Sequence, residues 1–205
     1  QFESFNSADF GVPKGREEDW RFTPMRRVRP LFDDAGYQGV PVVDISAPQY
    51  SEVRVVPREG ASEPVVSAPE DYPAALSWEK FEETTFVRIP REVELHEPIY
   101  LHVKPGPELK AGRIVIEAEA LSKATVVILH DGPANYNETV EIEAGDGANL
   151  SVITVHEWDR DALNTSSHRV RAGRDSTLHP MVVTLGGDLV RVKVARDFPG
   201  PRANA

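Results

Sequence analysis

Cysteine is absent from this chain of 205 residues. Without cysteine, the chain forms no disulfide bond, and thiolates are excluded as metal ligands within these residues. The absence does not indicate a cellular compartment, because a chain without thiols is compatible with any redox state.

Long apolar runs are also missing. No stretch approaches the roughly 18 consecutive apolar residues that a membrane-spanning helix needs, and no secretory leader follows Gln1. The formal net charge of −10 repels phosphate backbones, which argues against nucleic-acid binding. We therefore expect a cytoplasmic protein that binds neither membranes nor nucleic acids. Because the first residue is not methionine, we also expect the chain to begin inside a longer gene product.

Proline limits helix formation in the first half of the chain. The chain has 17 prolines, and each removes a backbone donor and disfavours helix at the residue before it. We expect residues 1–84 to form one N-terminal region. It would contain a loose arm (1–12), short helices at 14–22 and 71–83, and a connector rich in proline, glycine and acids (31–70).

The predicted helix at 14–22 has acidic residues near its start and arginines after its end, which suits the helix dipole. Thr23-Pro24 would end it, and Trp20 and Phe22 would anchor it on an apolar surface. Within the connector, short extended pieces are expected at 40–45 and 53–56.

From residue 85 the pattern changes to β-strands. Runs of β-branched and aromatic residues recur, several of them alternating with polar residues. No helix-length segment separates them, so a sheet built from βαβ units is excluded. The predicted strands are 86–89, 99–103, 114–116, 126–129, 140–142, 150–155, 181–185 and 189–194. We interpret 85–205 as a β core that is incomplete at its C-terminal end.

A turn repeats between these strands. A small residue recurs where a strand begins, at 124, 148, 176 and 203, with spacings of 24, 28 and 27 residues. A fixed period of this size without helices favours a β-solenoid, in which a small residue leaves room for the coil below. A β-sandwich, whose strands also recur at short intervals, is the alternative.

Six histidines are the candidates for a metal site: His96, His102, His130, His156, His168 and His179. The best local cluster is residues 156–161 (HEWDRD), with His168 nearby. It matches no known metal-ligand spacing such as H-E-x-x-H, and short Asp/Arg clusters are more often solvated loop tips. A metal role is therefore the less favoured interpretation.

Signals for catalysis are equally sparse. Ser166 and Ser167 precede His168, but neighbours in sequence do not make a catalytic triad. No phosphate-binding glycine motif occurs, and Gly186-Gly187 between two apolar strands is typical of a hairpin or a solenoid corner. We assign no catalytic, cofactor-binding or metal residue.

A charged outer sheet face leaves a carbohydrate-active β-solenoid enzyme open. Such an enzyme needs acids and bases gathered on one face, whereas alternating charge along a strand is more often a solvated face. The residues concerned are Glu141, Arg169, Arg171, Asp188, Arg191 and Lys193.

Three blocks of sequence carry a family resemblance. GREEDWRFTPMRRV (15–28) is similar to the N-terminal signature of SufD-type iron–sulfur cluster assembly scaffolds. EVELHEPIYLHV (92–103) resembles the opening strand of their core. VHEWDRDAL (155–163), followed by GRDSTLHPMVVTLGGDLVRVKV (173–194), resembles its central part.

The resemblance implies a right-handed parallel β-helix behind a small N-terminal helical region. It also implies a non-enzymatic scaffold that pairs with a SufB-like scaffold and a SufC-like ABC-type ATPase. In that family the iron–sulfur cluster and reduced flavin belong to the assembled complex. The cluster-related cysteine and histidine positions, and the helices that bind the ATPase, lie beyond Ala205. No ligand residue is therefore carried onto this chain.

An unfinished coil has physical consequences. Residues 199–205 would begin a coil that receives no strand, which would leave backbone donors and acceptors unpaired. We expect these 205 residues alone to form a homodimer through the exposed β-helix edge, or to aggregate. Besides the carbohydrate-active enzyme, a structural β-solenoid without a ligand is the remaining alternative.

Overall fold

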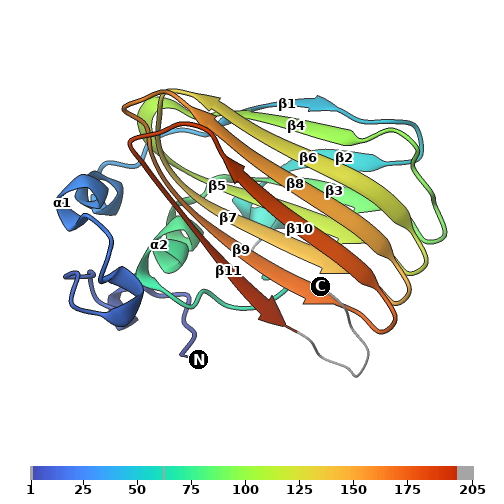
Figure 1. Ribbon diagram of the computed structural model, residues 1–205, viewed down its shortest axis with the longest axis horizontal. Coiled ribbons are helices and arrows are strands. Elements are labelled where there is room, and N and C mark those ends of the chain that lie inside the picture. Colours follow the sequence, from blue (N-terminus) through green and yellow to red (C-terminus); the bar gives the residue numbers. More distant parts are fainter. Residues whose placement is uncertain (1, 62, 198–205) are drawn as a thin grey trace.

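Successive strands of the chain alternate between two sheets, so that each pair of strands makes one coil of a solenoid (Figure 1). The computed structural model describes residues 2–61 and 63–197. One sheet has the order β1-β4-β6-β8-β10, and the other has the order β11-β9-β7-β5-β3-β2. These coils, with short helices before them, confirm the predicted mainly β fold with a solenoid core and a small N-terminal helical region.

Four short 3₁₀ helices and two α-helices occur among the described residues, all before the coils begin. They are η1 (Ser7–Asp9), η2 (Glu18–Trp20), α1 (Met25–Val28), η3 (Arg29–Phe32), η4 (Arg58–Gly60) and α2 (Tyr72–Lys80). The strands are β1 (Val42–Ser46), β2 (Glu52–Pro57), β3 (Glu83–Ile89), β4 (Ile99–Lys104), β5 (Gly106–Ala118), β6 (Lys123–Gly132), β7 (Ala134–Ala144), β8 (Asn149–Trp158), β9 (Leu163–Ala172), β10 (Thr177–Thr184) and β11 (Leu189–Asp197).

The first coil is bordered by two antiparallel strands. β1 pairs antiparallel with β4, and β2 pairs antiparallel with β3, whereas the pairings of the later coils are parallel. The extended pieces predicted at 40–45 and 53–56 are thus confirmed as β1 and β2. Both strands come from the proline-rich connector, which therefore contributes to both sheets.

The turns that join the coils form a ladder of equivalent residues. In three successive turns the backbone N–H of the fourth residue donates to the carbonyl of the first: Ser122 to Glu119, Ala148 to Gly145, and Ser176 to Gly173. These fourth residues are about 1% exposed. The small residues predicted at 148 and 176 are therefore confirmed, but their equivalent in the preceding coil is Ser122, not Ala124.

The predicted turn at 200–204 lies outside the described residues, as does the unfinished coil over 199–205.

One strand of the core has no counterpart in the predicted set. β9 has the sequence LNTSSHRVRA and is almost entirely buried, although most of its residues are polar. Its inward side chains join a polar interior, and its outward side chains lie under the N-terminal segment. Because neither face is apolar, the strand lacks the alternation that identified the others.

The N-terminal segment covers the outer face of the sheet that contains β5, β7 and β9. Trp20, Val28 and Leu31 are buried there with Leu163 and Leu189. The predicted helix at 71–83 is confirmed as α2, whose N-cap Asp71 accepts a hydrogen bond from the Ala74 N–H at 3.1 Å. In Figure 1, α2 lies against this sheet, and α1 stands at the outer end of the molecule.

The predicted helix at 14–22 is wrong in its extent. Only the single turn η2 forms there, and α1 begins just after Pro24, because the fixed φ of proline suits the start of a helix. Trp20 is buried as expected, but Phe22 is 90% exposed. The two aromatic side chains of this segment therefore have opposite environments.

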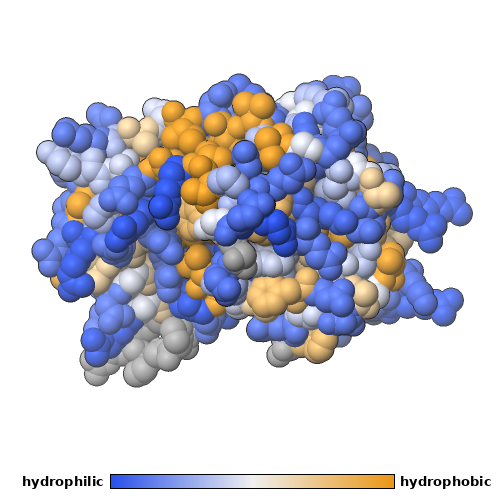
Figure 2. Space-filling model, turned by 180° about the vertical axis from the view of Figure 1, so that it is seen from behind, coloured by the Kyte–Doolittle hydropathy of each residue, from blue (hydrophilic) through white to orange (hydrophobic). Residues whose placement is uncertain are grey.

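The opposite sheet leaves its outer face uncovered by the described segments. Val42 and Tyr100 are exposed there, and Figure 2 shows hydrophobic side chains gathered along the upper margin of the molecule, where β1 and β4 lie in Figure 1. Within the described part of the chain, no helix is both long enough and apolar enough to cross a membrane.

Close stacking of the turns predicts a glycine requirement. A Cβ at Gly173 would lie 2.9 Å from the Asp146 nitrogen in the turn below. Gly173→Ala should lower the free energy of unfolding by about 1–3 kcal/mol, the usual cost of overpacking. Urea unfolding tests this, with Gly60→Ala as the control because a Cβ there meets nothing closer than 4.0 Å. Equal stability of the two variants would contradict the stacking.

Candidate functional site

A cluster of polar side chains lies inside the solenoid, between its two sheets. His130 on β6 and His156 on β8 enter from one sheet, and Glu138 on β7 and His168 on β9 enter from the other. Each of these side chains is at most 1% exposed. The parallel register places His130 beside His156 and Glu138 beside Ser166. We call the group His130, Tyr136, Glu138, His156, Ser166 and His168 the interior cluster.

Glu138 is the centre of the interior cluster. Its two carboxylate oxygens lie 2.9 and 3.0 Å from Nε2 of His130. They also accept hydrogen bonds from the Ser166 hydroxyl at 3.0 Å and from the Tyr136 hydroxyl at 3.3 Å. A buried carboxylate is stable only when such donors replace its water.

His130 is the counter-ion of Glu138. Its Nδ1 lies 3.3 Å from the carbonyl oxygen of Val155, so both ring nitrogens face acceptors, as those of a protonated imidazole do. Burial raises the pKa of Glu138, but the charge of His130 and its hydrogen bond outweigh burial and lower this pKa to about 2.

The other two histidines are neutral. Burial, helped by the charge of His130, lowers the pKa of His156 to about 3 and that of His168 to about 4. The His156 ring stacks on the His130 ring, with centroids 4.6 Å apart, and neither of its nitrogens has a hydrogen-bond partner. His168 has one contact, at 3.0 Å from the Ser166 hydroxyl oxygen.

These hydrogen bonds decide what the cluster can do chemically. The Ser166 proton goes to Glu138, so the oxygen of Ser166 accepts from His168 and the imidazole does not activate the serine as a base would. Among the described residues, no group of three or more His, Asp and Glu side chains is placed to hold a metal ion. The cluster therefore fits a fixed charge pair with neutral neighbours, and does not fit a ligand set for an iron–sulfur cluster.

The sequence predicted residues 156–161 as the best local cluster for a metal site, but in the structure their side chains point in different directions. His156 and Trp158 point into the core, whereas Glu157 and residues 159–161 are exposed. His102 pairs at the surface with Asp131 at 2.7 Å. His96 and His179 are also exposed. His130 and His168 do meet His156, but Glu138, on which the cluster depends, was missed.

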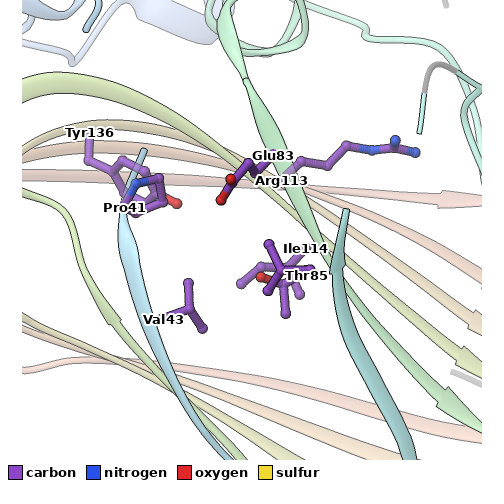
Figure 3. A pocket seen from close by; sticks show the side chains of 8 residues that line it. Pro41, Val43, Glu83, Thr85, Arg113, Ile114 and Tyr136 are labelled. Atoms are coloured by element: carbon purple, nitrogen blue, oxygen red, sulfur yellow. The ribbon is translucent and has the colours of Figure 1, made fainter. Parts of the chain in front are cut away.

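A small cavity borders the interior cluster at the end of the solenoid where β1 and β2 lie. Its volume is about 160 Å³. In Figure 3, Pro41, Val43, Glu83 and Tyr136 surround it, while the Arg113 side chain runs away from the group. Tyr136 is fully buried, and its hydroxyl passes over Gly112 toward Glu138. A Cβ added at Gly112 would lie 1.8 Å from the tyrosine oxygen, so only glycine fits there.

The charged outer face considered for carbohydrate chemistry is not a solvated face. Glu141 is buried and accepts hydrogen bonds from Arg113 at 2.6 and 2.9 Å and from the N–H groups of Val65 and Val66. Arg169 donates to the Ser67 carbonyl. The remaining residues of this face also contact the N-terminal segment: Arg171 with Val65, Asp188 with Arg27, Arg191 with Asp71, and Lys193 with Glu70.

The connector thus occupies the face that a sugar would need. Arg113 also stacks on Trp78 of α2, with its guanidinium carbon 4.5 Å from the ring centroid. Gly186, predicted at a corner, lies between β10 and β11, where a Cβ would be 2.2 Å from the Trp158 carbonyl oxygen. Its role is therefore close backbone packing.

Comparison with known proteins gives a consistent result. Residues 102–205 match the protein-family model described as "SUF system FeS cluster assembly, SufBD core domain". The chain is 34% identical over 207 residues to an iron–sulfur cluster assembly SufBD family protein of Mycobacterium bovis, and 34% identical over 208 residues to one of Mycobacterium leprae. Each alignment covers the whole chain but only 52% or 53% of the relative. The chain therefore spans about half the length of these curated relatives.

The unequal roles of two stacked histidines predict opposite responses to the same change. His156→Phe removes two unpartnered nitrogens at similar volume, so the free energy of unfolding at pH 7 should stay within about 1 kcal/mol of the parent value. His130→Phe leaves the Glu138 charge unpaired and should cost about 3–5 kcal/mol. Urea unfolding of both variants measures the difference. Similar losses would contradict the assigned charge pair.

The lowered histidine pKa values predict a loss of stability in acid. Well above pH 6.5 both histidines are neutral in the folded and unfolded states. As the pH falls from 6.5 to about 4, only the unfolded chain takes up protons at His156 and His168, so each lowers stability by up to about 1.4 kcal/mol per pH unit. Below pH 4.5, Glu138 adds a loss in the same direction.

Unfolding free energies measured from pH 7 to 4.5 test this effect. His156→Phe should make the slope shallower by nearly one proton, and His96→Gln, at an exposed position, should leave it unchanged. A slope that His156→Phe does not alter would show that this histidine is not buried neutral.

Proposed function

The chain belongs to the SufBD core family of the iron–sulfur cluster assembly (SUF) system, and we propose that it is a SufD-like scaffold subunit of a SUF-type assembly complex. The observation that carries the proposal is the family match over residues 102–205, which contains every coil from β5 onward. The N-terminal signature at 15–28 supports the SufD-like assignment.

A scaffold role, and not an enzymatic one, agrees with how the charged groups are used. Inside the solenoid, the carboxylate of Glu138 is hydrogen-bonded to His130 and Ser166. On the outer face of the sheet, the carboxylate of Glu141 is hydrogen-bonded to Arg113 and to the connector. These two buried carboxylates therefore stabilise the fold, which agrees with a scaffold role.

The proposal includes the partners and the cargo. A SufB-like scaffold and a SufC-like ABC-type ATPase would assemble with the protein in the cytoplasm, and the iron–sulfur cluster would be the cargo of that complex. Reduced flavin, if bound, would likewise belong to the complex.

Affinity purification of the natural-length protein from its own cells tests the proposal. Partners identified by mass spectrometry should include an ABC-type ATPase and a second β-helical scaffold in stable proportion, and a tagged unrelated protein from the same cells should recover neither. Recovery of the protein without an ATPase, at low and high salt alike, would contradict the scaffold role and leave the family membership as a statement about fold.

A further inference from the structure

The segment from Lys14 to Arg29 exposes cations that no carboxylate neutralises. Among the described residues, Lys14, Arg16, Arg21, Arg26 and Arg29 form no salt bridge, although all are exposed. Elsewhere in the described chain, only Arg54, Arg160 and Arg196 are likewise exposed and without a salt bridge. The chain has a net charge of −10, so acids to pair with are plentiful. Unpaired cations are therefore concentrated in one short segment.

Two of the three acids of the same segment have other partners, and the third, Glu18, forms no salt bridge with these cations. Glu17 accepts hydrogen bonds from the backbone N–H groups of Lys14 and Arg16. Asp19 lies 3.7 Å from Lys193 on β11. Counting six cations and three acids, residues 14–29 carry a net charge of +3. The positive field of this segment opposes that of the rest of the molecule.

Phe22 lies between these arginines in the sequence and is 90% exposed. Its guanidinium neighbour is Arg21, whose carbon atom lies 5.5 Å from the ring centroid. Arg26 and Arg29, one helical turn apart on α1 and η3, follow within seven residues. We call Phe22 with Arg16, Arg21, Arg26 and Arg29 the Phe22 patch.

The exposure of Phe22 does not come from a loose chain. On one side of it, Trp20 is 4% exposed, packs edge-on against Phe32 at 5.8 Å and lies under Arg191 at 4.0 Å. On the other side, Val28 is fully buried. The backbone is thus fixed before and after Phe22, and the aromatic side chain is held in water at a defined position.

We propose that the Phe22 patch docks a protein partner through a carboxylate-rich segment beside an apolar pocket that receives the phenyl ring. Arginine pairs with carboxylates through two parallel hydrogen bonds, and interfaces concentrate their binding energy in aromatic and arginine side chains. The partner is thus recognised by its acidic charge together with its pocket. This inference goes beyond the scaffold role and does not depend on it.

Other polyanions fit the patch less well. A nucleic acid is a long polyanion, so it would extend from the arginines over the acids at 17–19 and over a chain of net charge −10. A membrane surface calls for a long amphipathic helix, whereas α1 has four residues and the patch exposes a single large apolar side chain. A carboxylate-rich segment of a folded protein is short enough to face the arginines alone, and it needs no such helix.

A photo-reactive benzoylphenylalanine at position 22 of the natural-length protein identifies what covers the patch in its own cells. The proposal requires a protein adduct whose cross-linked peptide is rich in Asp and Glu. An adduct with nucleic acid or lipid, a cross-linked peptide without acidic residues, or no adduct at all would overturn it.

Affinity measurements on the purified pair then test the chemistry. Arg26→Glu with Arg29→Glu should weaken binding at least tenfold, Phe22→Ser should do the same, and the affinity of the parent pair should fall as salt is raised. Arg26→Gln with Arg29→Gln should give a smaller loss of the same kind, which guards against misfolding of the reversed variant.

Matched controls lie elsewhere on the surface. Arg54→Glu with Arg160→Glu reverses two exposed cations that also lack salt bridges, and Leu185→Ser removes a side chain that is 68% exposed. These variants should bind as the parent does. A loss in the control pair equal to that in the patch pair would show general electrostatic attraction and overturn the proposed docking site.

Discussion

Each strand of the solenoid obtains its backbone hydrogen bonds from a strand one coil away. β6, for example, pairs with β4 on one side and β8 on the other, and has no partner within its own coil. A coil is therefore not stable alone, and its residues are held in register with the coils above and below. The same register stacks Ser122, Ala148 and Ser176 at the corners and brings His130, Glu138, His156 and Ser166 together in the interior. The strand register that satisfies the backbone hydrogen bonds thus also determines which charged side chains come into contact.

Two buried ion pairs hold different parts of this fold together. His130 and Glu138 join the two sheets from inside, whereas Arg113 and Glu141 join the connector to one sheet from outside. Removing such charges from water costs free energy, so pairs of this kind specify an arrangement more than they add stability. Both pairs are surrounded by further donors, which fix one position for the connector and one separation for the sheets. A body specified in this way keeps its surface geometry.

Sequence patterns identified most strands, α2 and the solenoid, because these elements carry apolar alternation or a repeated turn. They did not identify β9, since its polar side chains are buried on both faces, or Glu138, since its importance arises only when β6 and β7 are folded together. The first corner residue was predicted at Ala124 and lies at Ser122, because Ala124 is also small and also buried. Phe22 was assigned to the core, as aromatic residues usually are. In each case the missing information was tertiary contact, which neither spacing nor composition contains.

The N-terminal segment folds against residues that the ribosome makes much later. Leu31 receives a hydrogen bond from Asn137, and Trp20 is covered by Arg191. At about 5–20 residues per second, the roughly 130 residues from Leu31 to Leu163 take on the order of ten seconds to synthesise. Throughout that time Trp20, Val28 and Leu31 lack the part of their packing surface that Leu163 and Leu189 supply. This segment is therefore made before the coils that it covers, and its burial is completed only after β9 and β11 exist.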